Sequence, residues 1–141
     1  AQQLVIVRQM TSDLALPTEI VGVETVREPD GLALSSRNRY LSPDERRRAA
    51  SLPAALQRGA EALRDGAETA AAVRDVRNHL VKAGLAIDYA DLRRLADLAP
   101  VAGDRPLTRD AGAEYLLAAA VRLGTTRLID NRRLDSNGSI R

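Results

Sequence analysis

The sequence predicts an α+β fold in which helices pack on an antiparallel sheet, and three local patterns support this prediction. A helix-start signal stands at Ser42-Pro43-Asp44-Glu45, where a capping hydroxyl, a proline and an acidic residue follow in the expected order. Residues 86–93 form a short strand pattern. Near the carboxyl end, Gly124-Thr125-Thr126 is a plausible hairpin turn before an alternating arm over 127–130. We therefore expect helices first and a sheet with a hairpin after them.

Length and composition limit the classes of protein to which the chain can belong. At 141 residues it is long enough for one ordinary domain with a hydrophobic core. That core must come from Leu, Val, Ile and Ala, because the sequence holds three Tyr and no Phe or Trp. The absence of Cys excludes disulfides and thiolate metal sites. A net charge of +2 is too small to indicate nucleic-acid binding. No apolar run approaches the length of a membrane span and no signal peptide is recognisable, so we expect a cytoplasmic protein.

The amino-terminal part begins with a helical pattern and continues with a strand pattern. A helix with one broad buried face is predicted over residues 1–14, because apolar residues recur three and four positions apart (Leu4, Val7, Met10 and Leu14). Pro17 ends that helix or the turn after it. Residues 19–26 are β-branched and partly alternating, and they predict a strand.

Two helices are expected after residue 42. The first continues at helical spacing past residue 60, with a kink or short break at Pro53, because proline removes an amide donor and crowds the preceding turn. Gly66 is expected to end it. The second helix should run from about Glu68 to Lys82, with Gly84 as its cap. Its inward-facing residues are expected to be Ala72, Val73, Val76, Leu80 and Val81.

Neither the single histidine nor the cluster of arginines predicts a site by itself. His79 has Asp75 and Lys82 as helix neighbours, which provide no set of ligands, so we predict no metal site. The arginines at 46–48 follow an acidic pair on the first turn of a helix, where such a charge run usually forms a solvated face.

The carboxyl-terminal third contains a conflict between propensity and pattern. Residues 96–113 carry two prolines and two glycines and are expected to form a loop. Leu and Ala dominate 114–123, so local propensity favours a helix there. A strand is favoured instead by the hairpin turn and the alternating arm that follow, and we predict the strand. Residues 132–141 are polar and are expected to be frayed.

The stretch 27–40 concentrates the chemistry of the chain. Asp30-Gly31 is a turn dipeptide, because Gly tolerates positive φ and Asp bonds its own backbone. Ser35, Ser36 and Arg37 offer two hydroxyls and a permanently charged guanidinium, which suit phosphate oxygens. The alternative is ordinary turn or helix-capping chemistry, since Ser-Ser-Arg triplets are common in loops.

The longer pattern over residues 27–41, Arg-Glu-x-Asp-Gly-Leu-Ala-x-Ser-Ser-Arg-Asn-x-Tyr-Leu, resembles the signature of the pantothenate synthetase (pantoate–β-alanine ligase) family. In that family it plays the part of the second nucleotide-binding signature of the class I aminoacyl-tRNA synthetase superfamily. Three further segments resemble the family in the same order along the chain: 2–9, 88–93 and 120–131. The resemblance covers almost the whole chain. It departs at Leu34, where a Met is usual; both side chains are flexible and apolar, so little effect is expected.

The resemblance implies a chain of two parts. Residues 1–41 would be the carboxyl-terminal remnant of a Rossmann-like nucleotide-binding domain, with 19–26 as the last strand of its parallel sheet. The Ser-Ser-Arg loop would follow the carboxyl end of that strand, where ligands bind in such folds. Residues 42–141 would form a lid domain of helices on an antiparallel sheet, with 114–123 as a strand. Closure of the lid would exclude water from the active site.

The activity that the resemblance implies is the ATP-dependent condensation of pantoate and β-alanine to pantothenate. Pantoate attacks the α-phosphate of ATP to form pantoyl adenylate and pyrophosphate, and β-alanine then displaces AMP. ATP and Mg²⁺ are the implied cofactors, and no carboxylate pair stands out as the Mg²⁺ ligand. The resemblance assigns pantoate binding to the side-chain amide of Gln3, which can both donate and accept. It assigns ATP binding to Val26, Leu34, Ser35, Ser36 and Arg37, of which the last three would also be catalytic.

Only the carboxyl-terminal half of the family is matched, and this leads to an expectation about activity. The family's His-x-Gly-His signature and its Lys-Asp pair would lie before Ala1, and the chain opens without an initiator Met. We therefore expect a fragment that is inactive alone and that requires the amino-terminal half as a partner.

Two other hypotheses stay open at this point. The chain could be a non-catalytic interaction or homodimerisation module, with residues 42–131 as a self-standing domain. A strand over 19–26 without sheet neighbours would also seek a partner. A nucleic-acid role for Arg37, Arg39 and the arginines at 46–48 would require a strongly salt-dependent affinity. The sequence lacks the aromatic residues that single-strand binders use for stacking. We predict no nucleic-acid or membrane partner.

Overall fold

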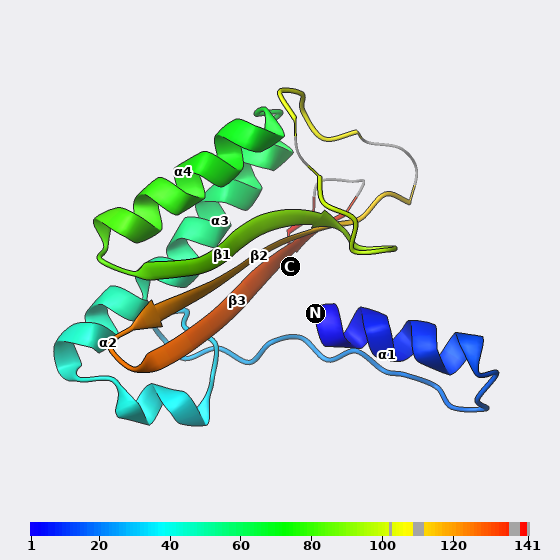
Figure 1. Cartoon of the computed structure of the whole chain (residues 1–141), viewed down its shortest axis with the longest axis horizontal. Helices are drawn as coiled ribbons and strands as arrows, with labels where there is room; N and C mark the ends of the chain where they lie inside the picture. Colours follow the sequence, from blue (N-terminus) through cyan, green and yellow to red (C-terminus); the bar gives the residue numbers. More distant parts are fainter. Residues whose placement is uncertain (102, 109–111, 136–138, 141) are drawn as a thin grey trace.

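Two long helices lie along one face of a three-stranded antiparallel sheet (Figure 1). The structure, a computed structural model, describes residues 1–101, 103–108, 112–135 and 139–140. Its elements in chain order are α1 (Gln2–Asp13), the short 3₁₀ helix η1 (Ser36–Tyr40), α2 (Pro43–Ala49), α3 (Ser51–Arg64), α4 (Thr69–Lys82), β1 (Ala86–Arg94), β2 (Tyr115–Leu123) and β3 (Thr126–Leu134). This arrangement confirms the predicted α+β fold.

The start and break signals of the first helical region are confirmed. Ser42 caps α2 through a capping box: its Oγ accepts the Glu45 N–H at 3.2 Å, and the Glu45 carboxylate accepts the Ser42 N–H at 2.9 Å. The predicted break separates α2 from α3 at Ala50, just before Pro53. The proline ring crowds the turn that precedes it, and Pro53 itself lies in the first turn of α3, where no amide donor is needed.

The second helix is confirmed with one correction. α3 and α4 end next to the predicted stop glycines, and α4 buries Ala72, Val76 and Leu80 as expected. Val81 is 63% exposed, so its predicted inward orientation is wrong. It follows Leu80 directly and therefore lies about 100° round the helix from that buried position.

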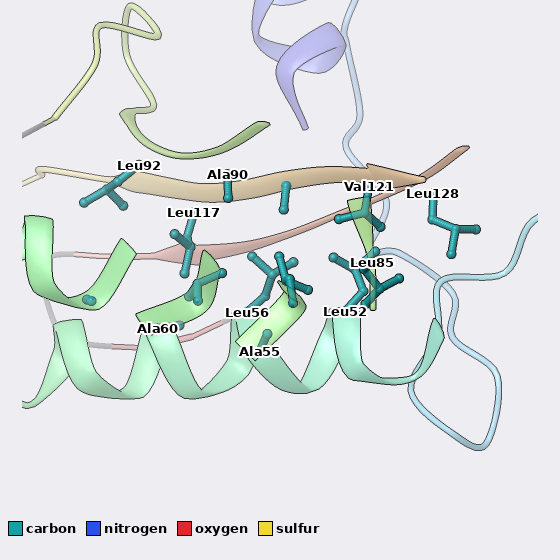
Figure 2. Close-up of a cluster of buried hydrophobic side chains, with 14 of the residues drawn as sticks. Leu52, Ala55, Leu56, Ala60, Leu85, Ala90, Leu92, Leu117, Val121 and Leu128 are labelled. Atoms are coloured by element: carbon teal, nitrogen blue, oxygen red, sulfur yellow. The ribbon is translucent and has the colours of Figure 1, made fainter. Parts of the chain in front are cut away.

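The hydrophobic core fills the space between the two long helices and the sheet. Figure 2 shows Leu52 and Leu56 of α3 directed toward Leu117 and Val121 of β2. All four side chains are fully buried. The core is therefore built from small and medium aliphatic side chains, as the composition predicted.

β2 is the central strand and pairs with β1 on one side and β3 on the other. The strand over 114–123 is thus confirmed against the helix that propensity favoured. β2 is buried almost throughout, so its continuous apolar run serves both faces of the sheet. Leu123 pairs with Thr126, which leaves Gly124-Thr125 as the turn; the φ of +57° at Gly124 requires a glycine.

The last strand continues further than the sequence suggested. β3 reaches Leu134, and Leu134 forms an isolated bridge with Ile140. Arg132 is 9% exposed and its Nε donates to Gln57 Oε1 on α3 at 2.9 Å, which satisfies a polar group that the sequence placed in solvent. The prediction of a frayed end is therefore wrong for residues 132–135; residues 136–138 and 141 lie outside the described residues. Between β1 and β2 the described residues form a loop, as predicted.

α1 and the extended segment after it lie apart from the helices that cover the sheet (Figure 1). The helix is confirmed, but its broad buried face is wrong, because Ile6, Met10 and Leu14 are 58%, 47% and 63% exposed. Residues 19–26 are extended and belong to no sheet among the described residues, so the predicted strand is also wrong. The Val26 carbonyl accepts the Leu34 N–H, but this bond lies within the hairpin that follows. A strand and a buried helix face both need neighbouring elements, and the described chain supplies none here. The described structure of the part before residue 27 is therefore one helix and an extended segment.

None of the described helices is both long and apolar enough to span a lipid bilayer.

Candidate functional site

Residues 26–34, here called the signature hairpin, form a tight antiparallel loop before η1. Arg27 and Ala33 form a bridge across it, and the Leu34 N–H donates to the Val26 carbonyl at 2.9 Å. These two contacts hold the two ends of the hairpin together. They therefore fix the backbone position at which Ser35 and η1 follow.

The Asp30-Gly31 turn at the tip of the signature hairpin is confirmed. Asp30 Oδ1 accepts the Leu32 N–H at 3.1 Å, and Gly31 has a φ of +83° that a residue with a side chain rarely adopts. Leu32 is 2% exposed and belongs to the hydrophobic core. The tip therefore packs on the α+β domain.

The base of the signature hairpin is joined to the sheet by an ion pair whose carboxylate is buried. Arg27 Nη1 and Nη2 donate to the two carboxylate oxygens of Asp130 on β3 at 2.8 and 3.0 Å. The Asp130 side chain is 1% exposed, and its Oδ1 also accepts the Asn131 N–H at 2.7 Å. Arg27 Nη1 donates further to the Gly31 carbonyl at 2.9 Å. One guanidinium thus holds both the hairpin tip and the last strand.

A second network holds η1 against the signature hairpin. The Glu28 carboxylate accepts from Asn38 Nδ2 at 2.6 Å and from Arg46 Nη2 at 2.7 Å. Asn38 Nδ2 also donates to the Ala33 carbonyl at 3.0 Å, and Arg46 pairs with Asp30. The hydrogen bond from Asn38 and then that from Arg46 lower the pKa of Glu28 below its ordinary value of 4.5. The carboxylate is therefore ionised at neutral pH and ties hairpin, η1 and α2 together.

The three residues expected to contact phosphate stand at the start of η1. Ser35 is its N-cap, and its Oγ accepts the Arg37 N–H at 3.2 Å, so the capping interpretation also holds for this hydroxyl. Ser36 and Arg37 are exposed, and neither side chain has a hydrogen-bond or ion-pair partner among the residues that the structure describes. One hydroxyl and one guanidinium are thus available to a ligand with phosphate oxygens.

The five residues to which the resemblance assigns ATP binding lie close together in the structure. We call them the strip: Val26, Leu34, Ser35, Ser36 and Arg37. Val26 and Leu34 are 64% and 63% exposed and are neighbours across the hairpin, and residues 35–37 follow directly. Gln3 lies on the exposed surface of α1, and no hydrogen bond between described residues joins it to this strip.

A cavity of about 490 Å³ lies between α1, the extended segment and β3. Arg8, Arg27, Asn131 and Arg133 contribute to its lining, whereas Gln3 and residues 35–37 do not. The sequence patterns had not indicated these four residues as candidates, because they come from segments far apart in the chain.

The donor set of the strip fits phosphate oxygens but does not supply a Mg²⁺ site. No group of three or more His, Cys, Asp or Glu able to hold a metal occurs within the described ranges. The carboxylates in the signature hairpin, Glu28 and Asp30, are both engaged by Arg46. Both carboxylates therefore already share one cation of the chain itself, and they do not stand as a free ligand set for Mg²⁺.

The chain thus contains a small α+β domain, and before it a segment that exposes the Ser36 hydroxyl and the Arg37 guanidinium. A family model described as pantoate-beta-alanine ligase matches residues 1–133, and the chain belongs to this family. Among curated relatives, the pantothenate synthetase of Anaeromyxobacter dehalogenans is 54% identical over 134 residues, and that of Shewanella amazonensis is 51% identical over 132 residues. These alignments cover 94% and 92% of this chain but 44% of each relative, so the chain spans less than half of their length.

Solved structures agree with this assignment. Pantothenate synthetase from Thermus thermophilus is 42% identical with a TM-score of 0.78, and the match covers 92% of this chain and 45% of that one. A pantoate-beta-alanine ligase from Francisella tularensis, complexed with beta-gamma ATP and β-alanine, has a TM-score of 0.58 at 22% identity, over 92% of this chain and 38% of that one. At that identity the likeness concerns the fold alone.

Proposed function

We propose that this chain is the carboxyl-terminal part of a pantoate–β-alanine ligase and supplies the phosphate-binding loop of its active site. The observation that carries the proposal is the segment 34–37, which two networks of bonds fix to the domain. Its Ser36 and Arg37 side chains are exposed and have no partners among the described residues. Membership of the pantoate–β-alanine ligase family supports the choice of substrates.

In the proposed reaction the pantoate carboxylate attacks the α-phosphorus of ATP, and the bond to pyrophosphate breaks. The amine of β-alanine then attacks the acyl carbon of pantoyl adenylate, and AMP leaves. Arg37 stabilises the charge that accumulates on pyrophosphate, while Ser35 and Ser36 donate to phosphate oxygens. Val26 and Leu34 would border the nucleotide. The protein forms no covalent bond with the reactants in this proposal. Correct positioning of the reactants therefore supplies much of the rate enhancement.

Pantoate is assigned to Gln3, whose amide can donate to the carboxylate and accept from a hydroxyl. Mg²⁺ accompanies ATP in reactions of this type, but the described residues offer no ligand set for it, and we assign it no step here. Residues 1–41 serve as the end of the nucleotide-binding domain and residues 42–141 as the lid. A cytoplasmic location is the expectation for such a biosynthetic enzyme.

The chain alone is proposed to be inactive, because it spans 44% of the length of its relatives. The part of such an enzyme that it lacks is the amino-terminal half. The exposed apolar side chains of α1 and of the extended segment, Ile6, Leu14 and Val23 among them, provide the surface for that half. The alternative of a non-catalytic interaction or homodimerisation module is not favoured by the family match.

Substitution of Arg37 tests the proposed role of the loop. In a mixture of this chain with the amino-terminal half of the A. dehalogenans relative, Arg37→Ala should lower pantoate-dependent ATP–pyrophosphate exchange roughly a hundredfold or more. Arg39→Ala is the matched control, because Arg39 is exposed on the same short helix and stacks on the Tyr40 ring. An equal loss in both variants would contradict a specific role for Arg37.

A further inference from the structure

We propose that the partly buried Arg27–Asp130 pair is a positioning device that fixes residues 35–37 relative to the three-stranded sheet. Its effect on the reaction rests on the proposed function, whereas its effect on the order of the loop does not. The pair joins residues that are 103 positions apart, one at the base of the signature hairpin and one in the last strand.

The geometry of the pair is directional. Both guanidinium ends of Arg27 meet both carboxylate oxygens of Asp130, at 2.8 and 3.0 Å, which fixes the planes of the two groups relative to each other. Asp130 is fixed in turn by the Asn131 N–H at 2.7 Å. Arg132 Nη1 lies 3.7 Å from Asp130 Oδ2, and Arg132 reaches Gln57 of α3, so the carboxylate is also connected to the helical layer.

The position of the loop follows from the position of Arg27. The Arg27–Ala33 bridge and the Val26–Leu34 hydrogen bond define the hairpin, and Ser35 follows within one residue. A rotation of Arg27 about the sheet would therefore move the start of η1 and the Arg37 side chain with it.

The other anchors of the hairpin do not join it to the sheet by directional bonds. Leu32 packs in the core, but apolar contact is non-directional and would let the hairpin rock. The Glu28 network joins the hairpin to η1 and, through Arg46, to α2, which Arg48 ties to the end of α4; none of these bonds reaches the sheet. Only the Arg27 contacts join the described hairpin to β3 by hydrogen bonds. An ion pair with a buried carboxylate is weak evidence for net stability, because desolvation offsets much of the attraction. Its bidentate geometry is what suits it to a positioning role.

Hydrogen exchange on the whole chain tests the positioning of the loop directly. Asp130→Asn keeps the size of the side chain and removes its charge. We expect the Leu34 and Asn38 amides, which donate to Val26 and Ser35, to exchange at least tenfold faster, while amides of the β2–β3 ladder keep their protection. Arg27→Lys, which keeps the charge and loses the bidentate geometry, should give a smaller effect in the same amides.

Asp88→Asn is the matched control. Asp88 on β1 is also held by two arginines, Arg122 at 3.1 Å and Arg127 at 2.7 Å, and neither of these ion pairs involves the hairpin. The substitution should leave the Leu34 and Asn38 amides unchanged. Unchanged exchange in Asp130→Asn and Arg27→Lys, or a loss of protection spread evenly over the sheet, would overturn the proposal.

Kinetics of the mixture with the amino-terminal half test the consequence for catalysis. We expect Asp130→Asn to lower kcat for pyrophosphate exchange by tenfold to a hundredfold with the KM for pantoate nearly unchanged. The double variant Arg27→Gln with Asp130→Asn should be no slower than the slower single variant, because both remove one interaction. Additive losses would overturn the proposal. If the unsubstituted mixture shows no exchange, the proposed function fails, and the amide measurements still decide the positioning.

Discussion

The attachment of η1 to the signature hairpin should depend on pH, because it is made through the Glu28 carboxylate. Its pKa is lowered by Asn38 and then by Arg46, so the folded chain binds a proton there less readily than the unfolded chain does. The stabilisation is therefore complete above about pH 4.5, the ordinary pKa, and is lost as the pH falls through the lowered value. We predict that η1 detaches from the signature hairpin in this acid range.

The side-chain amide resonances of Asn38 report this step, because Asn38 donates directly to Glu28. They should shift with a midpoint below 4.5 in the parent chain and show no such step in Glu28→Gln. A local probe is needed, since other carboxyls also titrate low: hydrogen bonds from Arg94 first, and then from the Ala99 amide, lower the pKa of Asp97 to about 2. Identical titrations of the parent and the variant would contradict the assignment.

At the level of single residues, contacts within a contiguous motif could be predicted from the sequence. Asp30 and Gly31 form the expected turn, and residues 35–37 lie together because they are adjacent in the chain. The partner of Arg27 could not be predicted in this way. Asp130 is 103 positions away, and no local pattern in one sequence indicates which carboxylate a given arginine meets.

Gly59 shows how packing decides the contacts between elements. It lies within α3, where Ala would have the better helix propensity by about 1 kcal/mol. A Cβ at this position would collide with Val76 Cγ2 of α4 and come within 3.0 Å of Leu117 Cδ2 of β2. Overpacking of this kind typically costs about 1–3 kcal/mol.

We therefore predict that Gly59→Ala lowers the free energy of unfolding, by up to about 2 kcal/mol, despite its better propensity. Denaturant unfolding measures the change. The double variant with Val76→Ala should lose less than the sum of the two single changes, because the smaller residue makes room for the new methyl group. A more stable Gly59→Ala would show that α3 and α4 are less closely packed than described.

Elements whose start and end signals are local were predicted well, whereas the pairing of the segment 19–26 depends on neighbours and was not. The α2 capping box and the break near Pro53 are local, and both are found. Local propensity in β2 favoured a helix, and the strand was predicted from the turn and the alternating arm after it, together with the family resemblance. The extended segment at 19–26 has strand composition but no described pairing partner, since composition cannot supply one.

The whole molecule consists of a packed α+β domain and an amino-terminal part with little burial. This difference predicts opposite effects of apolar substitutions. Ile6→Ser on α1, where Ile6 is 58% exposed, should change the unfolding free energy by less than about 0.5 kcal/mol. Leu56→Ala in the core should lower it by about 2–5 kcal/mol in a denaturant titration.

The Ile6 variant also tests the proposed surface for the missing half. Sedimentation with the amino-terminal half of a relative should show weaker association for Ile6→Ser than for the parent chain. Ile129→Ser is a suitable control, because Ile129 is exposed to a similar extent, 57%, on β3. Equal weakening by both, or by neither, would contradict the assignment of α1 to this surface.

The most direct test of the central claim is pantoate-dependent ATP–pyrophosphate exchange, measured on this chain, on the amino-terminal half of a relative and on their mixture. If the chain supplies the phosphate-binding loop of a pantoate–β-alanine ligase, exchange should occur in the mixture and in neither half alone. Exchange by this chain alone would contradict its proposed incompleteness. No exchange in a mixture whose two halves are shown to be associated would contradict the proposed role of the loop.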